Sequence, residues 1–136
     1  TSNLEHVSEA LREFIHEVKE KRGRLITTKA ADLLIADATW VIVHLPDTEA
    51  PYIKIQSPHA ERYTQSQSLR LDFSAYDKIT GVKQVTAVLD GVPVMNGQKI
   101  NLRTLSLGSH TLTVTAVDYA GNTSSKSVTF KVVHRK

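Results

Sequence analysis

Residues 112–132, LTVTAVDYAGNTSSKSVTFKV, decide the fold of the second half of the chain. Apolar and polar residues alternate on both sides of a polar segment, residues 118–122. Alternation with a period of two is typical of a strand that buries one face. Asp and Asn accept hydrogen bonds from nearby backbone N–H groups, and Gly and Asn tolerate positive φ. The stretch therefore predicts two strands joined at a corner that Asp118 caps.

The same alternation recurs from residue 52 onward, and Asp90-Gly91 marks a hairpin turn. Short alternating strands separated by turns indicate a β-sandwich, in which each sheet buries one face. Residues 46–51, PDTEAP, form a short linker before it. The predicted core residues of the sandwich are Tyr52, Ile53, Ile55, Leu69, Leu71, Phe73, Ala75, Val85, Ala87, Leu89, Ile100, Leu102, Leu112, Val114, Ala116, Val128, Phe130 and Val132.

Before the linker the period is helical. One stripe of apolar residues at helical spacing predicts a first helix, which Gly23 ends. Thr27 and Thr28 give a start signal for a second helix, which runs from about residue 29 to residue 45 and ends before Pro46. Residues 39–45, TWVIVHL, are rich in β-branched residues, so a strand is the alternative there.

The second helix is apolar nearly all round. Leu33, Trp40 and Val43 lie opposite its main apolar side, and such a helix is normally buried on more than one side. The first helix has a single stripe and covers only one of them. These three residues are therefore predicted to dock on a second body, either the sandwich that follows or a neighbouring domain.

Composition narrows the function classes. The chain has 136 residues, a formal charge of +3 and no cysteine, which excludes disulfides and cysteine-based metal sites. Basic residues gather only near the turn between the helices, where they complement a helix dipole, so no nucleic-acid partner is expected. No apolar run is long enough to span a membrane. The chain begins Thr1-Ser2-Asn3, from which we expect a fragment of a longer protein.

The second half resembles a bacterial Ig-like or fibronectin type III-like accessory module. The residues that carry the likeness are DTEAPYIKI at 47–55, ITGVKQVTAVLDGVPV at 79–94 and LGSHTLTVTAVDYAGNTSSKSVTFKV at 107–132. The last segment contains the Gly-x-His-x-Leu and Asp-x-Ala-Gly-Asn patterns of that family. The resemblance implies a secreted or cell-surface multimodular bacterial protein. The expected architecture is an N-terminal α-helical hairpin, residues 1–46, followed by an Ig-like antiparallel β-sandwich, residues 47–136.

The polar corner has a second interpretation as a calcium site. Calcium prefers six to eight oxygen ligands from carboxylates, amides and carbonyls. Asp118 and Asn122 supply two candidate ligands, and Asp72 or Asp77 are the candidates to approach them in space. No Asp-x-Asp-x-Asp run is present, so the structural role of the corner is favoured over calcium.

Sequence motifs bear on two further kinds of site, catalytic and polysaccharide-binding. No Gly-x-Ser-x-Gly elbow, His-Glu-x-x-His motif or phosphate-binding glycine loop is present, so the fragment itself is not expected to be an enzyme. Polysaccharide sites present flat aromatic rings, but aromatic residues are only 6% of this chain. Tyr76 and Tyr119 follow the ends of two predicted strands and, with Asp77, are the predicted ligand-binding residues.

The expected function is therefore that of a non-catalytic accessory module. It would space or dock a neighbouring domain of a secreted, carbohydrate-active parent protein. Two alternatives stay open: a carbohydrate-binding module that targets the parent enzyme to a polysaccharide, and an adhesin segment that binds a host protein by adding a strand at a sheet edge.

Overall fold

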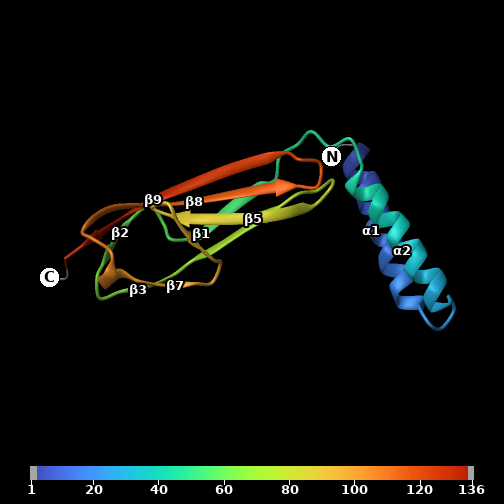
Figure 1. Cartoon of the computed structure of the whole chain (residues 1–136), viewed down its shortest axis with the longest axis horizontal. Coiled ribbons are helices and arrows are strands. Elements are labelled where there is room, and N and C mark those ends of the chain that lie inside the picture. The colour runs from blue at the N-terminus through green and yellow to red at the C-terminus, as the bar shows by residue number, and fades with distance from the viewer. Residues whose placement is uncertain (1–2, 135–136) are drawn as a thin grey trace.

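The computed structural model describes residues 3–134, which form a helical hairpin followed by an elongated β-sandwich. Figure 1 shows the hairpin projecting from one end of the sandwich, while β9 ends at the other. The hairpin consists of α1 (Asn3–Lys21) and α2 (Thr28–Val43). This arrangement confirms the predicted fold class of a helical hairpin followed by an Ig-like sandwich.

Local signals set the helix ends. Gly23 has a φ of 76°, which a glycine adopts without strain, and it lies just beyond α1. The Thr27 side chain caps α2 by accepting a hydrogen bond from the Ala30 N–H at 3.2 Å. The strand alternative for residues 39–45 is wrong. Ala38 and Ile42 are buried at helical spacing with Ala31, and this packing overrides β-propensity.

The sandwich consists of a five-stranded sheet, ordered β2-β9-β8-β5-β6, and two two-stranded ladders, β1-β4 and β3-β7. The strands are β1 (Tyr52–Ser57), β2 (Arg62–Thr64), β3 (Ser68–Arg70), β4 (Asp72–Tyr76), β5 (Val82–Leu89), β6 (Val92–Val94), β7 (Lys99–Asn101), β8 (Gly108–Asp118) and β9 (Thr123–Val133). A short 3₁₀ helix, Leu102–Thr104, follows β7. All pairs are antiparallel except β2 with β9, which is parallel and departs from the antiparallel prediction.

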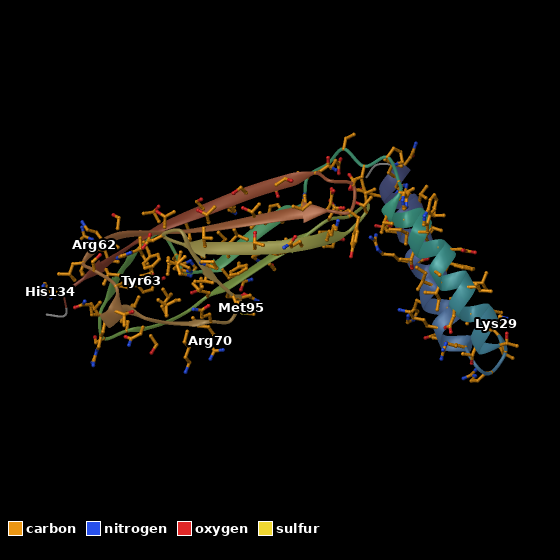
Figure 2. The ribbon with its side chains drawn as sticks, viewed as in Figure 1. Lys29, Arg62, Tyr63, Arg70, Met95 and His134 are labelled. Atoms are coloured by element: carbon orange, nitrogen blue, oxygen red, sulfur yellow. The ribbon has the colours of Figure 1, made fainter. Side chains whose placement is uncertain are left out.

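Alternate residues of facing strands fill the sandwich core. Leu71, Leu112, Val114 and Phe130 are among its fully buried side chains. Tyr63 of β2, labelled in Figure 2 at the end far from the hairpin, meets the Phe130 ring edge-on at 5.7 Å between centroids.

The prediction that Tyr52 and Val85 lie in the core is wrong. Tyr52 precedes Ile53, which faces the core, so the period of two turns Tyr52 outward. Val85 is partly exposed because it lines an open crevice with Val94 and Met95.

Candidate functional site

The corner between β8 and β9 is built around Asp118, which is fully buried. Its Oδ1 accepts hydrogen bonds from the N–H groups of Ala120 at 2.9 Å and Asn122 at 2.8 Å. Its Oδ2 accepts one from Asn122 Nδ2 at 2.8 Å. Gly121 has a φ of 90°, which the turn requires. These contacts give Asp118 the capping role that the sequence predicts for a strand corner.

Asp118 belongs to a cluster of three buried aspartates, with Asp47 and Asp77. One oxygen from each carboxylate lies within 4.8 Å of the others. Of the two neighbours considered for Asp118, Asp77 lies in the cluster, whereas Asp72 lies on the outer face of β4. Sequence reasoning missed Asp47, although it begins the first segment of the family resemblance.

Short hydrogen bonds hold the cluster together. The Thr80 hydroxyl donates to Asp47 Oδ2 at 2.7 Å, and the Glu49 N–H donates to Asp47 Oδ1 at 2.9 Å. Asp77 Oδ2 accepts from the Gly81 N–H at 2.9 Å and from the Ile79 N–H at 3.2 Å. Within residues 3–134, every fully buried side-chain N or O atom has a hydrogen-bond partner. The cluster therefore ties the linker to two loops of the sandwich.

The aspartates differ in their acid strength. Burial raises the pKa of Asp77, and the negative charges of Asp47 and Asp118 act in the same direction, against the Gly81 N–H bond. Burial alone would raise the pKa of Asp47 as well. Hydrogen bonds from Thr80 and Glu49 outweigh it and leave the pKa of Asp47 below its usual value. The environment therefore pushes the pKa values of two adjacent carboxyl groups apart.

The predicted calcium ligands Asp118 and Asn122 are in contact, but Asn122 presents its amide nitrogen. Nδ2 donates to Asp118 Oδ2 and to the backbone carbonyls of Asp47, at 2.9 Å, and Glu49, at 3.2 Å. Three neighbouring carboxylates are the oxygen ligands that calcium prefers. Each of the three carboxylates already accepts hydrogen bonds within the protein. The calcium assignment stays a prediction.

The loop after β4 also joins the sandwich to α1. Ser8 Oγ donates to the Ile79 carbonyl at 2.6 Å, and Arg12 Nη2 donates to the same oxygen at 3.1 Å. Arg12 Nη1 also contacts Ser8 Oγ. Lys78 Nζ lies 4.0 Å from a carboxylate oxygen of Glu5, which is itself buried. Residues 77–81 thus contact the base of the hairpin on one side and the aspartate cluster on the other.

Two of the three predicted docking residues, Leu33 and Trp40, are not covered by the sandwich. Leu33 is 58% exposed and Trp40 is 61% exposed, while Val43 is half-buried. The Trp40 ring stacks on His44 with 4.0 Å between centroids. The expectation that the sandwich of the same chain covers Leu33 and Trp40 is wrong, because both side chains are exposed, and it is α1 that donates hydrogen bonds to the sandwich. A neighbouring domain is the alternative that stays open.

The structure brings together only part of the predicted ligand-binding set. Asp77 is largely buried and its Oδ2 is hydrogen-bonded within its own loop, but it lines both crevices that Tyr76 borders. Tyr76 is 60% exposed and pairs across the ladder with Tyr52, which is 65% exposed. Tyr119 is 48% exposed, but it lines neither of the two crevices that Tyr76 borders. The structure therefore brings Tyr76 together with Tyr52 rather than with Tyr119.

No family model and no curated protein matches the sequence. Among solved structures, the chain is similar to an endo-β-1,4-mannanase from Thermotoga petrophila, with a TM-score of 0.52 and 13% identity over 78% of this chain and 24% of that one. The β half has an Ig-like β-sandwich fold. The fibronectin(III)-like modules of Clostridium thermocellum CbhA match with a TM-score of 0.49 and 18% identity, covering 62% of this chain.

A third match is the PKD1 domain of Vibrio anguillarum Epp, with a TM-score of 0.47 and 14% identity over 65% of this chain and all of that one. This chain spans about half of the CbhA chain, 47%, and a smaller share of the mannanase. At these identities the comparisons show the fold alone. No helix within residues 3–134 combines the length and the apolar character needed to cross a membrane.

Proposed function

We propose that this chain is a non-catalytic accessory module of a secreted, multimodular bacterial protein, in which it holds a neighbouring domain at a fixed position. The single observation that carries the proposal is the exposed apolar surface of the helical hairpin. Leu33 and Trp40 leave more than half of their side-chain surface exposed, although contact of apolar surface with water is unfavourable. A neighbouring helical surface of the same polypeptide is the occupant that we assign to it.

The apolar surface extends beyond these two residues. Val7 and Phe14 on α1 are each about 40% exposed, as are Leu34 and Val41 on α2. Both pairs are spaced by seven residues, so each lines one side of its helix. A seven-residue spacing of apolar side chains is what a further helix requires from its partner in a bundle. The hairpin therefore presents the surface of an incomplete helical bundle.

The joint between hairpin and sandwich supports the spacing role. Ser8 and Arg12 both donate hydrogen bonds to the Ile79 carbonyl, so directional bonds hold α1 to the sandwich. The sandwich then extends away from the hairpin along the long axis of the molecule, as Figure 1 shows. A domain bound on the hairpin would be separated from one that follows β9 by the length of the sandwich. We infer that residues 1–46 provide the docking surface and residues 47–136 the spacer.

Trp40 gives a direct test, because it is the only tryptophan in the chain. We expect its fluorescence in this chain to be red-shifted and readily quenched by acrylamide, as for an indole in water. In a longer polypeptide that carries the adjoining domain, the emission should shift to the blue and quenching should fall. If the adjoining domain contains tryptophan, it is replaced by phenylalanine beforehand. Leu33→Ser should reverse the change in the longer polypeptide only.

Equal quenching of Trp40 in both polypeptides would contradict the docking proposal. A blue shift that depends on the concentration of this chain alone would also contradict it, since a second copy would then be the occupant. Lys29→Ala is the matched control. Lys29 lies at the tip of the hairpin, far from the sandwich (Figure 2), and its replacement by alanine removes a charged group rather than a large apolar side chain.

A further inference from the structure

The outer face of the β1–β4 ladder carries two exposed aromatic rings side by side. Tyr52 and Tyr76 are directly opposite each other in the register, and both point away from the core-facing pair Ile53 and Ala75. Directly opposed residues on one face have Cβ atoms about 4.5–5.5 Å apart. The two exposed side chains therefore lie next to each other on the outer face of the ladder and form an aromatic platform.

Hydrogen-bonding side chains continue from this platform along the same face. Lys54 is opposite Ser74, one outward position further along the ladder. The Gln56 amide nitrogen donates to Asp72 Oδ2 at 3.2 Å, and the Gln56 amide oxygen accepts from Lys54 Nζ at 3.2 Å. From Tyr52 to Gln56 the strand rises about 13 Å, which exceeds the length of a single sugar ring. The face thus combines an aromatic end with a row of donors and acceptors.

A crevice extends the platform toward the hairpin. Tyr76 borders a crevice of about 550 Å³ between α1 and the sandwich, lined also by Arg12, Glu9 and Glu13. A second crevice, of about 190 Å³, lies beside both Tyr52 and Tyr76. The surface that meets the two rings is therefore hollowed on both sides of Tyr76. It is built jointly by the hairpin and the sandwich.

We propose that the Tyr52–Tyr76 face binds a neutral polysaccharide chain. Tyrosine rings cover the apolar C–H faces of pyranose rings, while the side chains beyond them satisfy hydroxyl groups. Charge favours a neutral polymer over an acidic one. Lys54 and Lys126 are matched in number by Asp72 and Glu49, and the crevices beside Tyr76 add more carboxylates than cations. Lys126 Nζ lies 5.8 Å from the Tyr52 ring centroid. This binding is independent of the docking surface on the hairpin.

The proposal is tested by electrophoresis of the full chain in gels that contain hydroxyethylcellulose, galactomannan or xylan. We expect at least one of these polymers to retard the chain. Tyr52→Ala and Tyr76→Ala should each weaken that retention about tenfold, because each removes one ring from the contact. Tyr76→Phe should retain most of it. Tyr119→Ala is the matched control, since it removes an exposed tyrosine outside both crevices, and it should leave retention unchanged.

A second measurement needs no substitution. On addition of a hexasaccharide of the retarding polymer, the ring resonances of Tyr52 and Tyr76 should shift and those of Tyr119 should not. Migration unaffected by all three polymers would overturn the proposal, as would equal losses for Tyr76→Ala and Tyr119→Ala. Binding of a proline-rich decapeptide to the same tyrosines in place of the sugars would overturn it too, because such peptides also dock on aromatic surfaces.

Discussion

His110 of β8 provides a stability prediction that depends on pH. In its buried ring, Nδ1 lies 2.5 Å from Asp90 Oδ2, and Nε2 lies 2.7 Å from the Ser106 carbonyl oxygen. Both nitrogens face acceptors, so only the protonated imidazolium donates both hydrogen bonds. Asp90 Oδ1 also accepts from the Thr111 N–H at 2.9 Å. The charged ring thus fixes the turn after β5 and the loop before β8.

The pKa shifts agree with this geometry. Burial alone would lower the pKa of His110, but the Asp90 carboxylate and the Ser106 carbonyl outweigh it and raise the pKa. Burial alone would raise the pKa of Asp90, and the His110 hydrogen bond outweighs that effect and lowers it. The contribution of His110 to the free energy of unfolding is complete below the pKa of an unfolded histidine, about 6.5, and is lost as pH rises through the pKa of His110 in the folded state. The Asp90 contribution is present above about pH 3.9 and is lost as pH falls through its lowered value.

The contribution of the pair should therefore be largest between about pH 4 and pH 6.5. Hydrogen bonds to charged groups contribute about 1.5–3 kcal/mol. Asp90 has a side chain that is 41% exposed, so solvent screening favours the lower end of that range. We expect His110→Gln to lower the free energy of unfolding by about 1.5–2 kcal/mol at pH 5.5, and by less than about 1 kcal/mol at pH 9.

Urea unfolding followed by circular dichroism measures both values, with equal m-values as the sign that the folded state is intact. Asp90→Asn and the double variant complete a mutant cycle that isolates the pair. A loss for His110→Gln that is the same at both pH values would refute the reasoning, because the imidazolium charge would then contribute nothing.

Three further changes test other parts of the structure. Thr27→Ala removes the cap of α2 and should lower the stability of that helix by about 1 kcal/mol. Hydrogen exchange should then become faster in the first turn of α2 than in α1. Ser8→Ala removes the bond to the Ile79 carbonyl and should broaden the range of hairpin orientations seen by small-angle scattering, while the sandwich melts unchanged. The unfolding temperature should be the same in calcium and in chelator, because both oxygens of Asp118 already accept hydrogen bonds. A rise in calcium that Asp118→Asn abolishes would instead establish the metal site predicted at Asp118 and Asn122.

The long strands were predictable because each contains its own signal. β8 alternates over eleven residues and β9 alternates from Val128 to Val132, and the Asp118 corner between the two strands follows from local turn chemistry. β2 has only three residues, too few to show a period, and it is defined by its parallel pairing with the distant β9. Its buried residue Tyr63 was therefore missed.

The site residues were predicted less well because they meet only through the topology. Asp47 and Asp77 are far from Asp118 in the sequence, and only the arrangement of the strands brings their loops to one end of the sandwich. Tyr52 was placed in the core because it begins an apolar run, although the alternation set by Ile53 faces it outward. α2 carries apolar residues on two sides, and the inference that a second body covers Leu33 and Trp40 stays a prediction.

The position of β9 has a mechanical consequence. β9 runs the length of the sandwich, paired with β8 from Gly108–Val132 to Val117–Thr123 and with β2 near its end. Tension between the hairpin end and the end of β9 would pull this strand lengthwise past both partners (Figure 1). Hydrogen bonds perpendicular to such a pull must break together rather than one after another. In a chain of modules under load, the sandwich would therefore resist extension by shear while the helical hairpin yields first.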